Sequence, residues 1–176
     1  MWNLACTQIR LIRNRLYNNI NMNWLSYVFS ILIAQGAGGI GAIFTTSKIP
    51  TWYAALAKPS WQPPSWVFGP VWTTLYLLMG IAAARIWNYR GRSSLVKGAL
   101  IVYTVQLILN ILWSVVFFGA QSPAGALLLI VALWLAIVAT IYQFWRIDHT
   151  AALLLVPYLL WVTFASVLNA TIWHLN

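Results

Sequence analysis

The chain has 176 residues, of which 62% are hydrophobic and only 6% are charged, and its formal net charge is +9. Soluble proteins carry about 25% charged residues, so this composition excludes an ordinary soluble domain and indicates a membrane protein. The ten basic residues are spread over connecting segments instead of collecting on one helix, so we expect no nucleic-acid partner.

The first segment, residues 1–22, is polar and basic and contains no acid. We expect a basic extension that is poorly ordered. A cleaved targeting peptide is a second interpretation, although such peptides are usually rich in serine and this segment has none. A third interpretation is an upstream start before Met22. Residues 23–176 would then form the membrane domain.

Five apolar segments follow, each long enough at about 1.5 Å per residue to cross a hydrocarbon core of about 30 Å. In the first, apolar character continues as far as Phe44, which favours a retained span over a secretory signal. The expected helices cover residues 24–45, 66–88, 95–118, 124–145 and 151–173. The expected fold class is therefore an all-α integral membrane protein, a bundle of five transmembrane helices.

Small residues cluster in the first of these segments, at Gly36, Gly38, Gly39, Gly41 and Ala42. Such a patch lets another backbone approach closely. Two interpretations stay open: close packing between helices, or a smooth wall against a flat ligand.

Residues 46–65, which we call the lid, form the one long interruption of the apolar pattern. Its prolines fix φ and push the residues before them into extended geometry, so we expect a stiff loop instead of a regular helix. Exposed indole is costly unless it meets a bilayer interface, a protein core or a ligand. We therefore expect this segment to cover a cavity, with its key positions at Lys58, Pro59, Trp61, Pro63 and Pro64.

The basic residues divide unequally between the two ends of the expected bundle. Only Lys48 and Lys58 fall on the lid side. The other end holds Arg10, Arg13, Arg15, Arg85, Arg90, Arg92, Lys97 and Arg146. The positive-inside rule then places the N-terminus in the cytoplasm and the lid on the far side. The expected location is a bacterial cell membrane, with an organellar or outer membrane as the alternative.

Ionisable groups are missing from the middle of the expected spans. The only acid, Asp148, lies in a connector, and His149 and His174 lie at membrane edges. Proton relays and ion-coupled transporters place such groups near the midplane, so this pattern argues against both. The single cysteine, Cys6, excludes an internal disulfide and a thiolate cluster. We expect no metal site.

Aromatic rings and neutral hydrogen-bonding groups share one face on three of the expected helices. The faces comprise Trp72, Tyr76 and Met79; Tyr103, Gln106, Asn110, Trp113, Ser114 and Phe117; and Tyr158, Trp161, Ala165, Leu168 and Asn169. A polar aromatic stripe is penalised against lipid, so we expect the three to converge under the lid around a cavity for a flat, mostly apolar ligand. Simple bridging between helices and aromatic packing is the alternative.

Four groups of residues in this chain form a recognisable combination. They are Trp52-Tyr53 with Lys58-Pro59-Ser60-Trp61 and Pro63-Pro64; Leu109-Asn110 with Trp113 and Phe117-Phe118-Gly119; Pro157-Tyr158-Leu159-Leu160-Trp161; and Phe164-Ala165-Ser166-Val167-Leu168-Asn169. Together they resemble the signature of the translocator protein family, also called TspO/MBR or tryptophan-rich sensory proteins. The resemblance covers about residues 24–173.

This resemblance implies a five-helix bundle, often a homodimer, that binds protoporphyrin, haem and other flat apolar molecules as ligands, with no cofactor required. It also implies a role in tetrapyrrole handling and stress response. Carried over position by position, it implies a cavity lined by Trp52, Tyr53, Trp72, Asn110, Trp113, Trp161, Ala165 and Leu168. To these the polar aromatic faces add Tyr76, Gln106 and Ser114.

The resemblance also implies two rival activities. Bacterial relatives degrade protoporphyrin in light and oxygen, and the tryptophans associated with that reaction match Trp72 and Trp161, which would then be catalytic. Animal relatives bind sterols through a tyrosine and a basic residue near the end of the last helix. Here Ala170 and His174 stand at those positions, so that pattern is broken. A lipid-binding or scaffolding membrane protein is the remaining alternative.

Overall fold

The computed structural model describes residues 24–176 in full, and only the backbone of residues 2–23. Helix α1 is Trp2–Thr45, and its apolar span is Trp24–Thr45, as expected. The expectation of a poorly ordered extension over residues 1–22 falls outside the fully described residues and stays a prediction.

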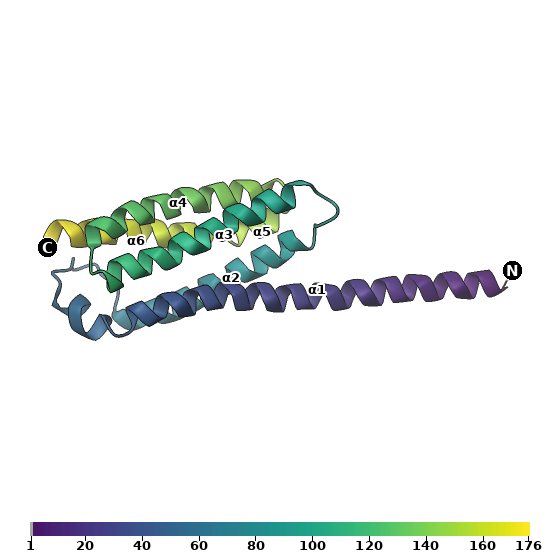
Figure 1. Cartoon of the computed structure of the whole chain (residues 1–176), viewed down its shortest axis with the longest axis horizontal. Coiled ribbons are helices and arrows are strands. Elements are labelled where there is room, and N and C mark those ends of the chain that lie inside the picture. Colours follow the sequence, from purple (N-terminus) through teal and green to yellow (C-terminus); the bar gives the residue numbers. More distant parts are fainter. Residues whose placement is uncertain (1) are drawn as a thin grey trace.

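Five helical stretches within the described residues are long and apolar enough to cross a membrane, which confirms the expected number. They lie side by side in one bundle (Figure 1). The helices after α1 are α2 (Phe68–Trp87), α3 (Leu95–Ser114), α4 (Pro123–Trp145), α5 (His149–Leu153) and α6 (Val156–Leu175). A helix satisfies its own backbone hydrogen bonds, which is the condition for crossing a hydrocarbon layer.

The third span ends in a widened turn instead of a regular helix. After α3, the π-helical turn η3 (Val115–Gly119) closes with the Ala120 N–H donating to the Val115 carbonyl at 2.8 Å. Phe117 and Phe118 are both buried here, and their ring centroids lie 4.8 Å apart. The turn thus directs two consecutive rings into the protein beneath the lid.

The fifth span is broken near its start, where residues 151–173 were expected to form one helix. Helices α5 and α6 are separated by Leu154 and Leu155. Pro157 lacks the N–H that would bond the Leu153 carbonyl, so the backbone leaves regular geometry just before it. The span remains one membrane crossing with a kink.

The lid is an ordered loop at the end of the bundle that holds the C-terminus (Figure 1). It begins with a π-helical turn, η1 (Ile49–Tyr53), and ends with a 3₁₀ turn, η2 (Ser65–Val67). The Asn176 side chain exchanges two hydrogen bonds of 3.0 Å with the backbone of Ala57, which fixes the loop to the end of α6. This geometry agrees with the expectation of a stiff loop that is not a regular helix throughout, although the loop carries a short helical turn at each end.

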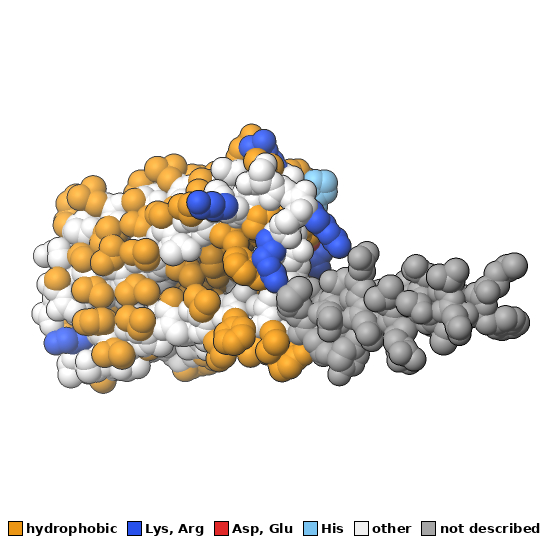
Figure 2. Space-filling view, turned by 45° about the vertical axis from the view of Figure 1, so that its right-hand side comes forward, with side chains coloured by type: hydrophobic (Ala, Val, Ile, Leu, Met, Phe, Trp, Pro, Cys, Tyr) orange, Lys and Arg blue, Asp and Glu red, His pale blue; other side chains and the backbone are white. Residues whose placement is uncertain are grey.

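Close packing of α1 on α2 brings the first helix against the bundle. A Cβ atom on Gly80 would lie 2.5 Å from the Ile31 Cα, so only glycine permits this approach. At the opposite end from the lid, Arg85 and Asp148 form an ion pair with a 2.8 Å contact that joins α2 to the start of α5. Apolar side chains cover the sides of the bundle, as expected for a surface in contact with lipid (Figure 2).

Candidate functional site

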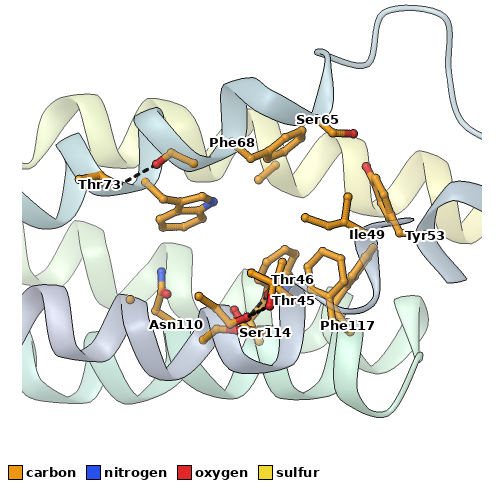
Figure 3. Close-up of a pocket in the computed structure, with 18 of the residues that line it drawn as sticks. Thr45, Thr46, Ile49, Tyr53, Ser65, Phe68, Thr73, Asn110, Ser114 and Phe117 are labelled. Atoms are coloured by element: carbon orange, nitrogen blue, oxygen red, sulfur yellow. Dashed lines mark hydrogen bonds between the residues drawn. The ribbon is translucent and has the colours of Figure 1, made fainter. Parts of the chain in front are cut away.

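A cavity of about 550 Å³ lies between the lid and helices α1, α2, α3 and α6. In Figure 3, Phe68 from α2 faces Asn110 and Ser114 from α3 across the hollow, while Tyr53 and Ile49 from η1 close the end nearest the lid. Pockets that enclose organic ligands measure about 300–1,000 Å³, so this one has the size of a binding site.

Nine of the eleven predicted ligand-binding residues line the cavity. They are Tyr53, Trp72, Tyr76, Asn110, Trp113, Ser114, Trp161, Ala165 and Leu168. The remaining two, Trp52 and Gln106, lie outside its wall.

Trp52 lies behind the cavity wall. Its ring meets those of Phe117 and Phe118 edge to face, with centroids 5.6 and 6.4 Å away. Its neighbour Tyr53 is the residue that reaches the cavity, because adjacent residues of a helical turn point in different directions. Trp52 therefore supports the rings that form the wall.

Gln106 lies deeper in the bundle than the cavity reaches. On α3 the lining residues start at Asn110, one helical turn closer to the lid. Gln106 is fully buried, and its amide donates only a weak hydrogen bond to the Met79 sulfur at 3.6 Å. The polar face on α3 is thus continuous, but the cavity occupies only its lid half.

Asn110 forms the floor of the cavity and connects three helices. Its carbonyl oxygen accepts a short hydrogen bond from the Tyr76 hydroxyl, and its amide donates to the Tyr158 hydroxyl at 2.8 Å. Because buried polar groups that find partners fix the geometry around them, this network holds α2, α3 and α6 in one arrangement. The floor is therefore preformed.

A second hydrogen-bonded chain fixes the wall near the lid. The Trp113 indole N–H donates to the Asn169 side-chain oxygen at 3.1 Å, and the Asn169 amide donates to the Pro123 carbonyl at 2.8 Å. Trp113 also stacks on Phe117, with centroids 5.1 Å apart. The Trp113 N–H is consequently engaged within the protein.

The Trp161 indole N–H differs from that of Trp113. It is buried and has no hydrogen-bond partner among the described residues. Its ring lies beside those of Phe68 and Phe164, at 5.8 and 5.4 Å between centroids, so the indole is held in place. A buried donor without a partner costs about 1–3 kcal/mol, which an acceptor on a bound molecule would recover.

The five key lid positions, from Lys58 to Pro64, do not line the cavity; they organise the loop instead. The Lys58 ammonium donates to the carbonyls of Tyr53, Ala54 and Leu56 at 2.7–2.9 Å, which satisfies backbone groups that the loop leaves free. Trp61 packs edge to face on Phe164, at 5.8 Å between centroids.

The prolines of the lid also act through the backbone. Pro59, Pro63 and Pro64 do not line the cavity, and they restrict the loop between η1 and η2.

The Tyr53 hydroxyl is uncharged in the folded protein. Burial raises the pKa of this hydroxyl to about 12, so this cavity group stays neutral at physiological pH.

Several lining residues were not among the predicted site residues. Trp66 and Phe68, just before and within the start of α2, reach the cavity from the lid side. From α1, the cavity is lined by Gly38, Gly39 and Gly41. The small-residue patch allows close packing, because a Cβ on Gly38 would lie 2.4 Å from the Tyr76 ring, and it also forms part of the cavity wall.

The cavity offers binding chemistry instead of acid–base chemistry. Its described walls carry aromatic rings, small residues and neutral polar groups, without a carboxylate, histidine or lysine. No cluster of three or more potential metal-ligating side chains occurs among the described residues. This lining fits a flat, largely apolar molecule with a few hydrogen-bonding atoms at its edge.

Comparison with known proteins places this architecture in a family. The TspO/MBR family model matches residues 30–174. The chain is 43% identical to the "Tryptophan-rich protein TspO" of Chlorobaculum tepidum over 89% of its own length and 99% of the relative's. It is 44% identical to "Protein CrtK" of Rhodobacter capsulatus, over 80% and 86% of the two lengths. It is 39% identical to the human "Translocator protein", over 78% and 82%.

These matches run through all five apolar spans and the cavity between them. Together with the five membrane-crossing helices, they identify an integral membrane protein, and the chain belongs to the TspO/MBR family.

Proposed function

We propose that this protein binds a porphyrin, such as protoporphyrin or haem, in the cavity under the lid, and that it serves tetrapyrrole handling in its membrane. The observation that carries the proposal is the cavity itself. Indole, phenol and phenyl rings from the lid, α2, α3 and α6 surround one hollow of about 550 Å³. Rings arranged in this way favour a planar aromatic ligand through stacking and edge contacts.

The polar groups on the wall support a ligand with acceptor atoms at its edge. The unpartnered N–H of Trp161 would donate to a carboxylate or ring nitrogen of the ligand, and the Ser114 hydroxyl also lines the cavity. Recovering one buried donor contributes about 1–3 kcal/mol to binding. Stacking on Trp72 and Tyr53 would supply most of the remaining affinity.

Titration of the purified protein with protoporphyrin tests this proposal. The Soret band and porphyrin fluorescence should shift on binding, and affinity should fall at least tenfold when Trp72 and Trp161 are both replaced by alanine. Trp173→Ala is a matched control, since this indole lies on α6 but is 53% exposed and outside the cavity. Equal affinity in the double variant and in the control would refute the site.

A second candidate activity is light-driven oxidation of the bound porphyrin, with oxygen as the oxidant. It is favoured by the presence of two tryptophans, Trp72 and Trp161, in the lining of one cavity. Illumination of the complex should then give a defined product that is lost in Trp161→Phe. Bleaching at the rate of free porphyrin, unchanged in that variant, would leave binding alone.

We further propose that the end of the bundle opposite the lid faces the cytoplasm of a bacterial cell. Arg85, Arg90, Lys97 and Arg146 all lie in or beside the connectors at this end, while Lys48 and Lys58 lie at the other. Such an imbalance orients membrane proteins with the basic end inside. Cysteine labelling of Ser93→Cys from the outside of intact cells should therefore fail, whereas Ser60→Cys should react.

A further inference from the structure

A second hollow lies at the basic end of the bundle, far from the lid. It is a groove of about 610 Å³ where α2 ends and α3 begins. We call it the α2–α3 groove. Its rim carries Arg90, Lys97 and the hydroxyls of Ser93 and Ser94. Its wall continues down α3 along apolar side chains, so the groove is polar at one end and apolar at the other.

The cations of this groove have no acidic side chain to neutralise them. The chain contains a single acid, Asp148, and its carboxylate pairs with Arg85 at 2.8 Å. Arg90 is instead held over the Trp87 ring, with its guanidinium 4.8 Å from the ring centroid. This contact positions the charge at the rim and leaves most of its N–H donors available.

The start of α3 adds to the positive potential. α3 has 20 residues and no acid in its first turn. The helix dipole therefore contributes partial positive charge at the same rim as Arg90 and Lys97. Figure 2 shows most of the visible Lys and Arg side chains toward the right-hand end of the bundle, the end opposite the lid. The complement of such a rim is a phosphate-sized anion.

The apolar wall of the groove indicates whether that anion is a free phosphate or the headgroup of a lipid. Ile101 and Val105 line the groove on α3 and are 54% and 46% exposed, within a membrane-spanning segment. A free phosphate would use only the rim, whereas an acyl chain would cover these two side chains as well. Basic pockets between membrane helices, next to such apolar walls, are suited to anionic lipid headgroups.

We propose that the α2–α3 groove binds one anionic phospholipid from the leaflet at the basic end. Its phosphate contacts Arg90 and Lys97, and one acyl chain lies along Ile101 and Val105. This site is separate from the cavity under the lid, with which it shares no lining residue. Lipid binding here would fix the connector between α2 and α3 at the membrane surface.

Native mass spectrometry of the full chain in a neutral detergent, titrated with phosphatidylglycerol or phosphatidylcholine, tests the proposal. One phosphatidylglycerol should bind per chain more tightly than phosphatidylcholine, and excess inorganic phosphate should not displace it. Arg90→Gln and Lys97→Gln should each weaken binding about fivefold, the contribution of one basic residue near an anionic headgroup.

Arg146→Gln is the matched control, because it removes one charge at the same end but outside the groove. It should change the affinity less than twofold. An equal loss in all three variants would overturn the site in favour of general surface electrostatics. Equal affinity for the two lipids would also overturn the proposed site. So would the observation of a dimer that binds no phosphatidylglycerol, because the groove would then be an interface between two copies.

Discussion

Gly38→Ala tests the packing on which the cavity depends. A Cβ atom at this position would lie 2.4 and 2.5 Å from two carbons of the Tyr76 ring. Non-bonded carbons prefer about 3.5–4.0 Å, so the ring would have to move by about 1 Å or more. Tyr76 is buried and its hydroxyl donates to Asn110, so the displacement would break the floor of the cavity.

The expected cost can be assembled from three contributions. Overpacking of a core costs about 1–3 kcal/mol. Loss of the Tyr76–Asn110 hydrogen bond adds about 0.5–1.5 kcal/mol. Replacement of glycine by alanine within a helix returns about 0.5–1 kcal/mol. The free energy of unfolding should therefore fall by roughly 0.5–4 kcal/mol, with a central value of about 2 kcal/mol. Porphyrin affinity should fall with it, because the ring moves at the cavity wall.

Gly36→Ala is the matched control for this experiment. Its Cβ would meet nothing within 4 Å, and the residue does not line the cavity. Thermal unfolding in detergent and porphyrin titration should show Gly36→Ala equal to, or slightly more stable than, the parent protein. If Gly38→Ala behaves like Gly36→Ala in both assays, the proposed contact between α1 and the Tyr76 ring is incorrect.

Three further predictions concern other parts of the structure. Gly80→Ala should destabilise the protein by about 3 kcal/mol or more in thermal unfolding, since its Cβ would meet the backbone of Ile31, which cannot rotate away; an unchanged Tm would contradict the close contact of α1 with α2. Asp148→Ala should lower the Tm more than Asp148→Asn, because asparagine keeps the helix cap and loses only the ion pair with Arg85; equal losses would assign no role to the cap. Stability should fall as the pH rises from about 10 toward 12, because Tyr53 keeps its proton in the folded state and loses it in the unfolded state; Tyr53→Phe should make this decline shallower, and an identical slope would argue against burial of the hydroxyl.

The number and limits of the membrane spans could be predicted because each depends on a long local run of apolar residues. All five expected spans begin and end within about two residues of the observed ones. The π-helical turns at Val115–Gly119 and Ile49–Tyr53 could not be predicted in this way. Such turns are decided by how their aromatic side chains pack against other elements, which hydropathy does not encode.

The cavity was predicted from helical periodicity, and its limits follow from tertiary packing. Periodicity places Gln106 and Asn110 on one face of α3, yet only Asn110 reaches the cavity. The difference arises because Tyr76 and Tyr158 close the space at the level of Asn110. Trp66 was missed for a related reason: it lies in the 3₁₀ turn η2 just before α2, where the period of a regular helix does not predict the direction of a side chain.

A structure of the protein with bound protoporphyrin tests the central claim most directly. The macrocycle should lie under the lid between Trp72 and Trp161, with an acceptor atom within hydrogen-bonding distance of the Trp161 indole nitrogen. A macrocycle bound on the outer, lipid-facing surface, with the cavity collapsed or filled by side chains, would contradict the account.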